Sequence, residues 1–224
     1  GFVLLLVAII SFSSGGKKST TLTDEGALLL NLDGYLADNR DETLRWQDAL
    51  SELNGEYVPR KISTFDVVSA IGYAQQDPQI KGLVLDLNHF EEADLPALDF
   101  IGATINRFKE SGKPVIAYAD NYTQGQYYLA SFANEIYLNT IGQVDIHGLA
   151  QENLYFKDML DKLAVTPHIF RVGTYKSAVE PFMRNDMSIE AKTNMQRWLN
   201  LMWNHYTSMV SENRHIKSNE LLPA

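Results

Sequence analysis

Lys176 is the residue of this sequence whose type and setting could best carry out chemistry. It lies within residues 170–182 (FRVGTYKSAVEPF), where an apolar run turns into a segment limited by a proline, among aromatic and small neighbours. Such surroundings can remove water from an ammonium group, and burial lowers the pKa of a lysine. A lysine whose pKa falls to about 7–8 can serve as a general base near neutral pH. The alternative is an ordinary surface lysine, and Ser177 is not its natural partner because adjacent side chains diverge.

The other residue types that commonly carry chemistry form no catalytic pattern. The sequence has no cysteine, which excludes disulfides, thiol catalysis and thiolate metal sites. It contains no HExxH, no GxGxxG and no Walker loop, so we expect no metal ion, no cofactor and no nucleotide. Glu91, Glu92 and Asp94 could mimic an acid pair, although a solvated loop is the simpler interpretation. The histidines, which lack metal-ligand spacing, are His89, His147, His168, His205 and His215.

Length and composition indicate an ordinary globular protein. The chain has 224 residues, of which 45% are hydrophobic, enough for one large α/β domain or two small ones, and no break in composition favours two. It carries 28 acidic residues against 19 basic ones and no long run of like charge. This balance argues against a nucleic-acid partner.

Short apolar runs alternate with stretches of helical periodicity along the chain. Ser63 and Asp94 are predicted helix caps, and Gly112 followed by Pro114 is a predicted helix end. This alternation predicts a parallel sheet built from right-handed crossovers. Residues 37–61 are charged and polar, and we expect them to form a surface excursion with at most one short helix. We predict strands at residues 27–32, 83–87, 115–119, 135–138 and 165–172, and helices at about 63–77, 94–111, 124–132 and 154–163.

A last helix is predicted at about residues 189–213. Its apolar residues follow helical spacing and form one continuous stripe. The stripe consists of Met195, Trp198, Leu199, Met202, Tyr206 and Met209. Such a helix could pack on its own domain or on a partner, and the sequence leaves both possibilities open.

The first residues form a separate segment. Residues 2–12 (FVLLLVAIISF) are an apolar run that is too short to cross a bilayer core of about 30 Å at about 1.5 Å per residue. Because the chain starts at Gly1 rather than Met, we expect a truncated membrane anchor with further residues upstream. The alternatives are the hydrophobic region of a signal peptide and a buried core helix.

The motif GTYKSAVEPF resembles the lysine motif of the signal peptide peptidase A (protease IV) family. The resemblance runs from ALLLNLDG through KGLVLDL and SGKPVIAYADNYTQGQYYLASFANEIYLN to FRVGTYKSAVEPF, and it is specific to the long, two-repeat bacterial form. It implies a crotonase-like (Clp-protease-like) α/β fold behind an amino-terminal membrane anchor. The implied layout is an anchor remnant at 1–14, a tether at 15–26, the amino-terminal repeat at 27–215, and at 216–224 the start of a connection to a second repeat.

The same resemblance implies a chemistry and a setting. In the family the first repeat provides a general-base lysine, which corresponds to Lys176, and the second repeat provides the nucleophilic serine. This Ser-Lys dyad acts on hydrophobic peptides, chiefly the remnants of cleaved signal peptides. The resemblance also implies a homotetramer at the bacterial inner membrane, with its catalytic part on the outer, periplasmic face.

Two departures from the catalytic repeat fit this division of labour. Gln124 stands where the nucleophilic serine of the second repeat would be, and residues 88–92 (NHFEE) offer no glycine where that repeat builds its oxyanion hole. We therefore expect residues 1–224 to be inactive alone. Two alternatives remain open, namely a non-catalytic scaffold repeat and an acyl-CoA enzyme of the crotonase type. The glycine-poor turn speaks against the second.

Overall fold

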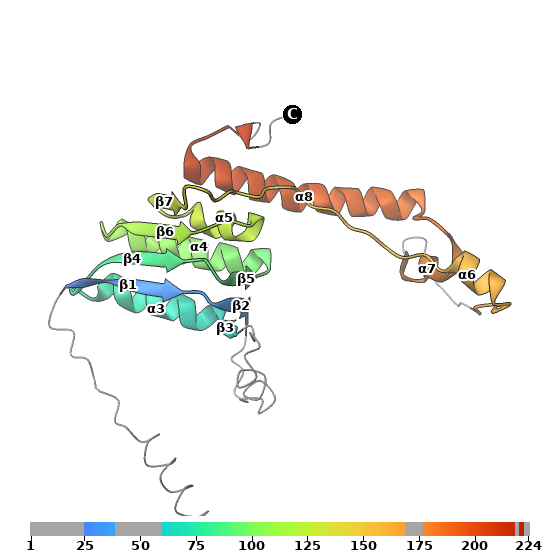
Figure 1. The fold of residues 1–224 in the computed structure, drawn as a ribbon, viewed down its shortest axis with the longest axis horizontal. Helices are drawn as coiled ribbons and strands as arrows, with labels where there is room; N and C mark the ends of the chain where they lie inside the picture. Colours follow the sequence, from blue (N-terminus) through green and yellow to red (C-terminus); the bar gives the residue numbers. More distant parts are fainter. Residues whose placement is uncertain (1–24, 39–59, 169–176, 218–219, 222–224) are drawn as a thin grey trace, which may run out of the picture.

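A four-stranded parallel sheet with the strand order β1-β4-β6-β7 forms the centre of the molecule (Figure 1). The structure is a computed structural model that describes residues 25–38, 60–168, 177–217 and 220–221. The strands are β1 (Gly26–Asn31), β4 (Ile80–Asp86), β6 (Val115–Ala119) and β7 (Glu135–Leu138). Every neighbouring pair is parallel, so each connection has to cross back over the sheet.

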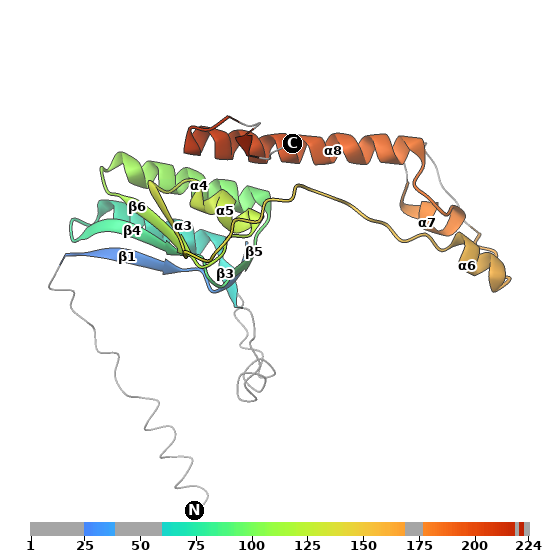
Figure 2. The same cartoon turned by 45° about the horizontal axis from the view of Figure 1, so that its top comes forward.

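Three helices cover one face of this sheet (Figures 1 and 2). They are α3 (Thr64–Gln76), α4 (Leu95–Glu110) and α5 (Gln124–Ala130). Side chains alternate between the two faces of a strand, and β4 turns Leu83 and Leu85 toward the helices, where both are buried. Ile101 and Ile105 of α4 are buried in the same core. The predicted α/β architecture with a parallel sheet is therefore confirmed.

The predicted helix ends are confirmed by their hydrogen bonds. The Ser63 hydroxyl accepts a bond from the amide of Asp66 at 3.3 Å, and the Asp94 carboxylate accepts one from the amide of Ala97 at 2.8 Å. Each bond satisfies an amide that has no partner inside the helix. Gly112 follows α4 with a φ of 79°, a left-handed conformation that glycine adopts without strain.

A second, smaller parallel sheet was not expected from the sequence. Its strands are β2 (Gly34–Ala37), β3 (Lys61–Ser63) and β5 (Phe90–Glu92), in the order β3-β2-β5. Two of these strands have only three residues, which is too short to show an alternating pattern. Gly34 is required at the start of β2, since a Cβ there would lie 2.0 Å from the carbonyl oxygen of Arg60.

An arm projects from the sheet body in both views (Figures 1 and 2). We define it as residues 150–168 together with residues 177–201. It contains α6 (Lys157–Lys162), the short 3-10 helix η1 (Ser177–Val179), α7 (Glu180–Met183) and the first half of α8 (Ile189–Arg214). An extended segment leads out from the body to α6, and α8 leads back.

The tip of the arm is held together by a buried carboxylate and by ring stacking. Glu180 accepts bonds from the amide of Ser188 at 3.1 Å and from its hydroxyl at 2.5 Å, which joins α7 to the start of α8. The amide of Phe156 donates to the carbonyl of Pro181 at 2.7 Å. The rings of Phe156 and Phe182 stack at 6.1 Å. These contacts tie the outgoing and returning segments together.

Two predicted elements in the arm differ from the structure. The strand expected at 165–172 is wrong for residues 165–168, which are exposed and pair with none of the described strands. Pro167 has no amide to donate to a neighbouring strand. The helix expected at 154–163 is shorter, since α6 spans only Lys157–Lys162.

The sequence left open whether the last helix packs on its own domain or on a partner, and its two halves differ in this respect. Helix α8 is formed as predicted, and near its carboxyl end Tyr206 and Val210 are buried against the sheet body. Trp198 and Leu201, in its first half, are 60% and 61% exposed. One half of the helix therefore completes the core, and the other half remains accessible.

Several predictions concern residues outside the described ranges. They are the apolar run 2–12, most of the excursion 37–61, and Lys176 with the residues just before it. Within the described residues, no helix combines the length and apolar character needed to cross a membrane. The proposed anchor and tether therefore stay predictions.

The packing of α4 against the segment after α5 predicts opposite effects for two helical glycines. A Cβ at Gly102 would lie 2.4 Å from the ring of Phe132, whereas a Cβ at Gly72 meets nothing within 4 Å. Gly102→Ala should therefore lower the free energy of unfolding by about 1–3 kcal/mol. Gly72→Ala should raise it by about 0.5–1 kcal/mol because alanine favours the helix. Urea unfolding measures both, and a stabilised Gly102→Ala variant would contradict this packing.

Candidate functional site

The carboxyl ends of β4 and β6 are where a site is expected in an open parallel sheet. Ligands of such sheets bind outside the carboxyl ends of the strands. Here the chain leaves β4 through a turn at Asn88 and His89, and it leaves β6 through residues 120–123 into the amino end of α5. These connections place Gln124, the predicted replacement for the nucleophile, at the first position of α5.

The side chain of Gln124 is used for structure. Its Oε1 accepts bonds from the amides of His147 at 3.3 Å and Gly148 at 3.0 Å, and its Nε2 donates to the carbonyl of Gly148 at 3.2 Å. Its backbone carbonyl accepts a bond from the hydroxyl of Tyr206 at 3.1 Å. Gln124 thus fastens the start of α5 to the segment after β7 and to α8. It presents no nucleophile.

Two backbone amides of the turn after β4 already donate hydrogen bonds within the turn. The amide of Asn88 donates to the carboxylate of Asp86 at 3.1 Å, and the amide of Phe90 donates to the carbonyl of Leu87 at 3.2 Å. An oxyanion hole needs donors aimed at the space where the reacting oxygen will lie. These two amides are already bonded. The turn therefore gives no support to an acyl-CoA enzyme of the crotonase type.

A buried glutamine that sequence reasoning missed joins this turn to α5. The side chain of Gln126 donates to the carbonyl of Phe90 at 2.6 Å and accepts from the amide of Thr123 at 2.9 Å. The hydroxyl of Thr123 in turn accepts from the amide of Gln126 at 3.3 Å. This is a capping box, and the spacing Thr-x-x-Gln was the signal that could have revealed it.

An apolar pocket of about 500 Å³ opens beside the start of α5. It lies between the amino ends of α4 and α5 and the middle of α8. Gln124 and Asp94 are among the polar residues that line it. Its lining is Ala93, Asp94, Leu95, Pro96, Leu98, Gln124, Gly125, Tyr128, Leu149, Trp198, Met202 and Tyr206. A pocket of this size with aromatic and aliphatic walls suits apolar side chains or a small apolar ligand.

Three titratable side chains from three helices meet beside this pocket. The hydroxyl of Tyr128 in α5 donates a short hydrogen bond to Asp99 of α4, and His205 of α8 lies 2.9 Å from the other carboxylate oxygen. The ring of Tyr206 stacks on that of Tyr128 at 5.3 Å. Burial, and then the bond to Asp99, raise the pKa of Tyr128 above its ordinary value. This cluster holds the carboxyl half of α8 on the body.

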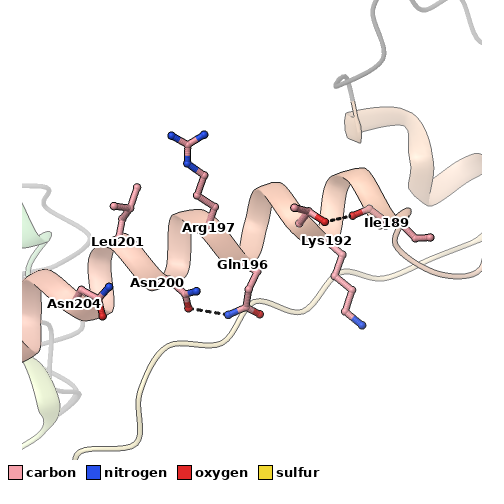
Figure 3. Close-up of a pocket in the computed structure, with 8 residues that line it drawn as sticks. Ile189, Lys192, Gln196, Arg197, Asn200, Leu201 and Asn204 are labelled. Atoms are coloured by element: carbon pink, nitrogen blue, oxygen red, sulfur yellow. Dashed lines mark hydrogen bonds between the residues drawn. The ribbon is translucent and has the colours of Figure 1, made fainter. Parts of the chain in front are cut away.

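A second hollow runs along the first half of α8 (Figure 3). Its lining is Ile189, Lys192, Thr193, Gln196, Arg197, Asn200, Leu201 and Asn204. Figure 3 shows Lys192 and Arg197 leaving the helix on different sides. The side-chain Nε2 of Gln196 donates to the side-chain Oδ1 of Asn200 at 2.9 Å. Because these side chains do not converge on one point, the hollow carries no catalytic arrangement.

The remaining candidate residues fall into three groups. Lys176 lies outside the described residues. Asp94 caps α4, and Glu91 is exposed, so the structure does not assemble them into a catalytic acid pair. Within the described residues, no group of three or more His, Asp or Glu side chains is arranged to hold a metal ion.

Comparison with known proteins gives close relatives. The model of peptidase family S49 matches residues 107–224. Protease 4 of Haemophilus influenzae is 83% identical over 223 residues, which span all of this chain and 36% of that protein. Protease 4 of Salmonella typhi is 46% identical over 224 residues, covering 99% of this chain and 36% of that protein. The chain therefore spans about a third of the length of these relatives.

Similarity to solved structures is weaker. An enoyl-CoA hydratase/isomerase family protein from Silicibacter pomeroyi shares 13% identity, with a TM-score of 0.32 over 71% of this chain and 81% of that chain. A score this low supports no argument about function. The assignment to a family therefore rests on the family model and the relatives found by sequence.

The raised pKa of Tyr128 predicts a loss of stability at high pH. The folded protein keeps the phenol proton, whereas the unfolded chain releases it near pH 10. This contribution is thus fully present below about pH 10 and is lost as the pH rises above it, by up to about 1.4 kcal/mol per pH unit. Urea unfolding between pH 8 and 11 should show a shallower pH dependence for Tyr128→Phe than for the wild type. The exposed control Tyr73→Phe should leave the slope unchanged, and equal slopes for all three proteins would refute the assignment.

Proposed function

Because the chain belongs to peptidase family S49, we propose that it is the lysine-supplying half of a serine protease that degrades cleaved signal peptides. The family match and the parallel sheet with its flanking helices confirm the crotonase-like (Clp-protease-like) fold class. The observation that carries the proposal is the 83% identity to a Protease 4 along the entire chain. The matched family region, residues 107–224, includes Lys176.

In the proposed reaction Lys176 is the general base of a Ser-Lys dyad. Neutral Lys176 accepts the proton of a serine hydroxyl while the serine oxygen bonds to the carbonyl carbon of the peptide. When the tetrahedral intermediate collapses, the C–N bond breaks and the lysine returns the proton to the departing amine. Water then releases the acyl group from the serine by the same route. Backbone donors outside this chain stabilise the charge on the carbonyl oxygen.

The carboxyl edge of the sheet supports the division of labour between two halves. Gln124, which the resemblance aligns with the nucleophile, has its side chain bonded to the backbone of residues 147 and 148. The amides of Asn88 and Phe90 are bonded within their own turn. A serine and an oxyanion hole from elsewhere in the full-length protein are therefore part of the proposal, and residues 1–224 alone are inactive.

The apolar pocket supports hydrophobic peptides as the substrate class. Its lining is mainly aromatic and aliphatic, with Trp198, Met202 and Leu98 among the residues. The hydrophobic part of a signal peptide, which stays in the membrane after cleavage, would offer apolar side chains to such a pocket. Residues 2–12 are proposed to anchor the protein in the bacterial inner membrane, with the catalytic part on the periplasmic face.

The arm supports the proposed homotetramer. Exposed apolar side chains occur along its whole length, on α6, on α7 and on the first half of α8. They are Leu154, Met159, Leu163, Val165, Phe182, Met183, Ile189, Trp198 and Leu201. Apolar surface that projects from a body and stays accessible is typical of a protein–protein interface. Copies of the same protein are the proposed partners.

Substitution of the lysine tests the mechanism. In the full-length protein, Lys176→Ala should lower the rate of hydrolysis of a hydrophobic signal-peptide substrate by about 10³-fold or more, because the nucleophile loses its base. The matched control is Lys217→Ala, an exposed lysine after α8, which should keep the wild-type rate. Circular dichroism checks that both variants are folded. Unchanged hydrolysis by Lys176→Ala would instead favour a scaffold role for this half.

Charges on the arm test the assembly. Ile189 and Leu201 are 80% and 61% exposed, and a carboxylate buried at an interface without a partner is costly. The double variant Ile189→Glu/Leu201→Glu of the full-length protein should weaken association at least about tenfold, since few residues dominate an interface. Light scattering after size-exclusion chromatography in detergent measures the mass. Tyr73→Glu, on α3 away from the arm, is the control, and an unchanged mass for the double variant would exclude this part of the arm from the interface.

A further inference from the structure

The face of the β1-β4-β6-β7 sheet opposite α3, α4 and α5 carries an apolar surface, which we call the outer sheet face. It is formed by Leu29, Val84, Ile116, Tyr118 and Tyr137, which alternate with the residues of the core. Leu29 is 59% exposed, Tyr118 38% and Tyr137 52%. Among the described helices, α3, α4, α5 and α8 all lie on the opposite side (Figure 2).

The strand register lines these side chains up in two rows across the sheet. In one row Leu29 pairs with Val84, and Val84 pairs with Ile116. In the next row Asp86 pairs with Tyr118, and Tyr118 pairs with Tyr137. Ile116 pairs in turn with Glu135, and Asp86 pairs with Asn31. The first row is therefore apolar across β1, β4 and β6, and the second across β6 and β7. The two apolar parts meet on β6 at Ile116 and Tyr118.

Two tyrosine hydroxyls and one carboxylate on this face have hydrogen-bond partners. The hydroxyl of Tyr118 donates to Asp120 at 2.5 Å, and that of Tyr137 donates to Glu135 at 2.6 Å. Asp86 accepts two bonds from Asn88, from its amide at 3.1 Å and from its side chain at 2.9 Å. Covering the face would therefore leave neither tyrosine hydroxyl without a hydrogen bond, which lowers the cost of burying these two side chains.

We propose that the outer sheet face is covered in the full-length protein by the part of the same polypeptide that lies outside residues 1–224. This inference rests on the proposed function, in which the chain is one half of a longer protease. Parallel sheets occur almost only with both faces covered, whereas antiparallel sheets tolerate one face in water. The chain spans 36% of its relatives, so about two thirds of such a polypeptide is available as the cover.

Coverage within one polypeptide is favoured over coverage by a second copy. A tethered partner acts at a high effective concentration, so an apolar face of moderate size suffices to hold it. The exposed apolar residues of the arm lie on a separate part of the molecule and remain free for contacts between copies (Figure 1). The two surfaces thus have different partners.

Single cysteines test the cover, because residues 1–224 contain none. Leu29→Cys and Tyr137→Cys place a thiol on the outer sheet face, and Tyr73→Cys is the matched control on α3, where the side chain is 78% exposed. Each is made in the full-length protein, with any cysteine outside residues 1–224 replaced by serine. The measurement is the rate of maleimide labelling of the native protein relative to the urea-unfolded protein.

Native labelling at positions 29 and 137 should be at least about tenfold slower than in the unfolded protein, whereas Tyr73→Cys should show little protection. Dilution to the monomer should not change these ratios. Labelling as fast as that of Tyr73→Cys at both face positions would overturn the proposal. Protection that disappears on dilution would also overturn it and would assign the face to a second copy. Labelling needs no catalysis, so this result is independent of the Lys176→Ala experiment, which tests the proposed function.

Discussion

A parallel sheet cannot leave both of its faces in water, and the rest of this structure depends on that constraint. Strands joined by crossover helices receive a helical layer on one face, here α3, α4 and α5, which bury Leu83 and Leu85. The alternation of side chains gives the opposite face its own apolar rows through Leu29 and Ile116. The same crossovers bring the ends of β4 and β6 together at one edge, where the candidate site lies.

At that edge, the side-chain amides of three residues bond to the backbone of neighbouring segments. The side chain of Gln124 bonds to the backbone after β7, and that of Gln126 bonds to the carbonyl of Phe90 after β4. The side chain of Asn88 accepts a hydrogen bond from the backbone amide of Asp120 at 2.7 Å. Each of these bonds joins segments that are far apart in the sequence. An amide side chain can donate and accept at once, which suits it to this role. The edge is therefore held together by hydrogen bonds between distant segments.

The two halves of α8 differ in what they contact. The carboxyl half of α8 is bound to the body through Tyr206 and through the cluster of Tyr128, Asp99 and His205. The first half extends from the body with Trp198 exposed. At its start, Glu180 accepts a hydrogen bond from the hydroxyl of the capping residue Ser188. A helix that is fixed at one end and free at the other can hold an apolar surface at a set distance from the sheet.

The sequence by itself determined the features whose causes are local. The alternation of strands and helices and the caps at Ser63 and Asp94 depend on residues within a few positions of one another, and each was predicted correctly. The family also followed from a contiguous motif, although the role of Lys176 stays a prediction because it lies outside the described residues.

Only the tertiary structure decided what depends on distant partners. In the small sheet Gly34 lets β2 approach the backbone of Arg60, and strands of three residues are too short to show a pattern in the sequence. Residues 165–168 resemble a strand in composition but pair with none of the described strands. The hydrogen bonds of Gln124 depend on residues 147 and 148, which are distant in the sequence. Helix α8 is buried only along the half that packs against the sheet and its helices. Local pattern fixes conformation over one turn or strand, whereas burial and pairing are set by segments that only folding brings together.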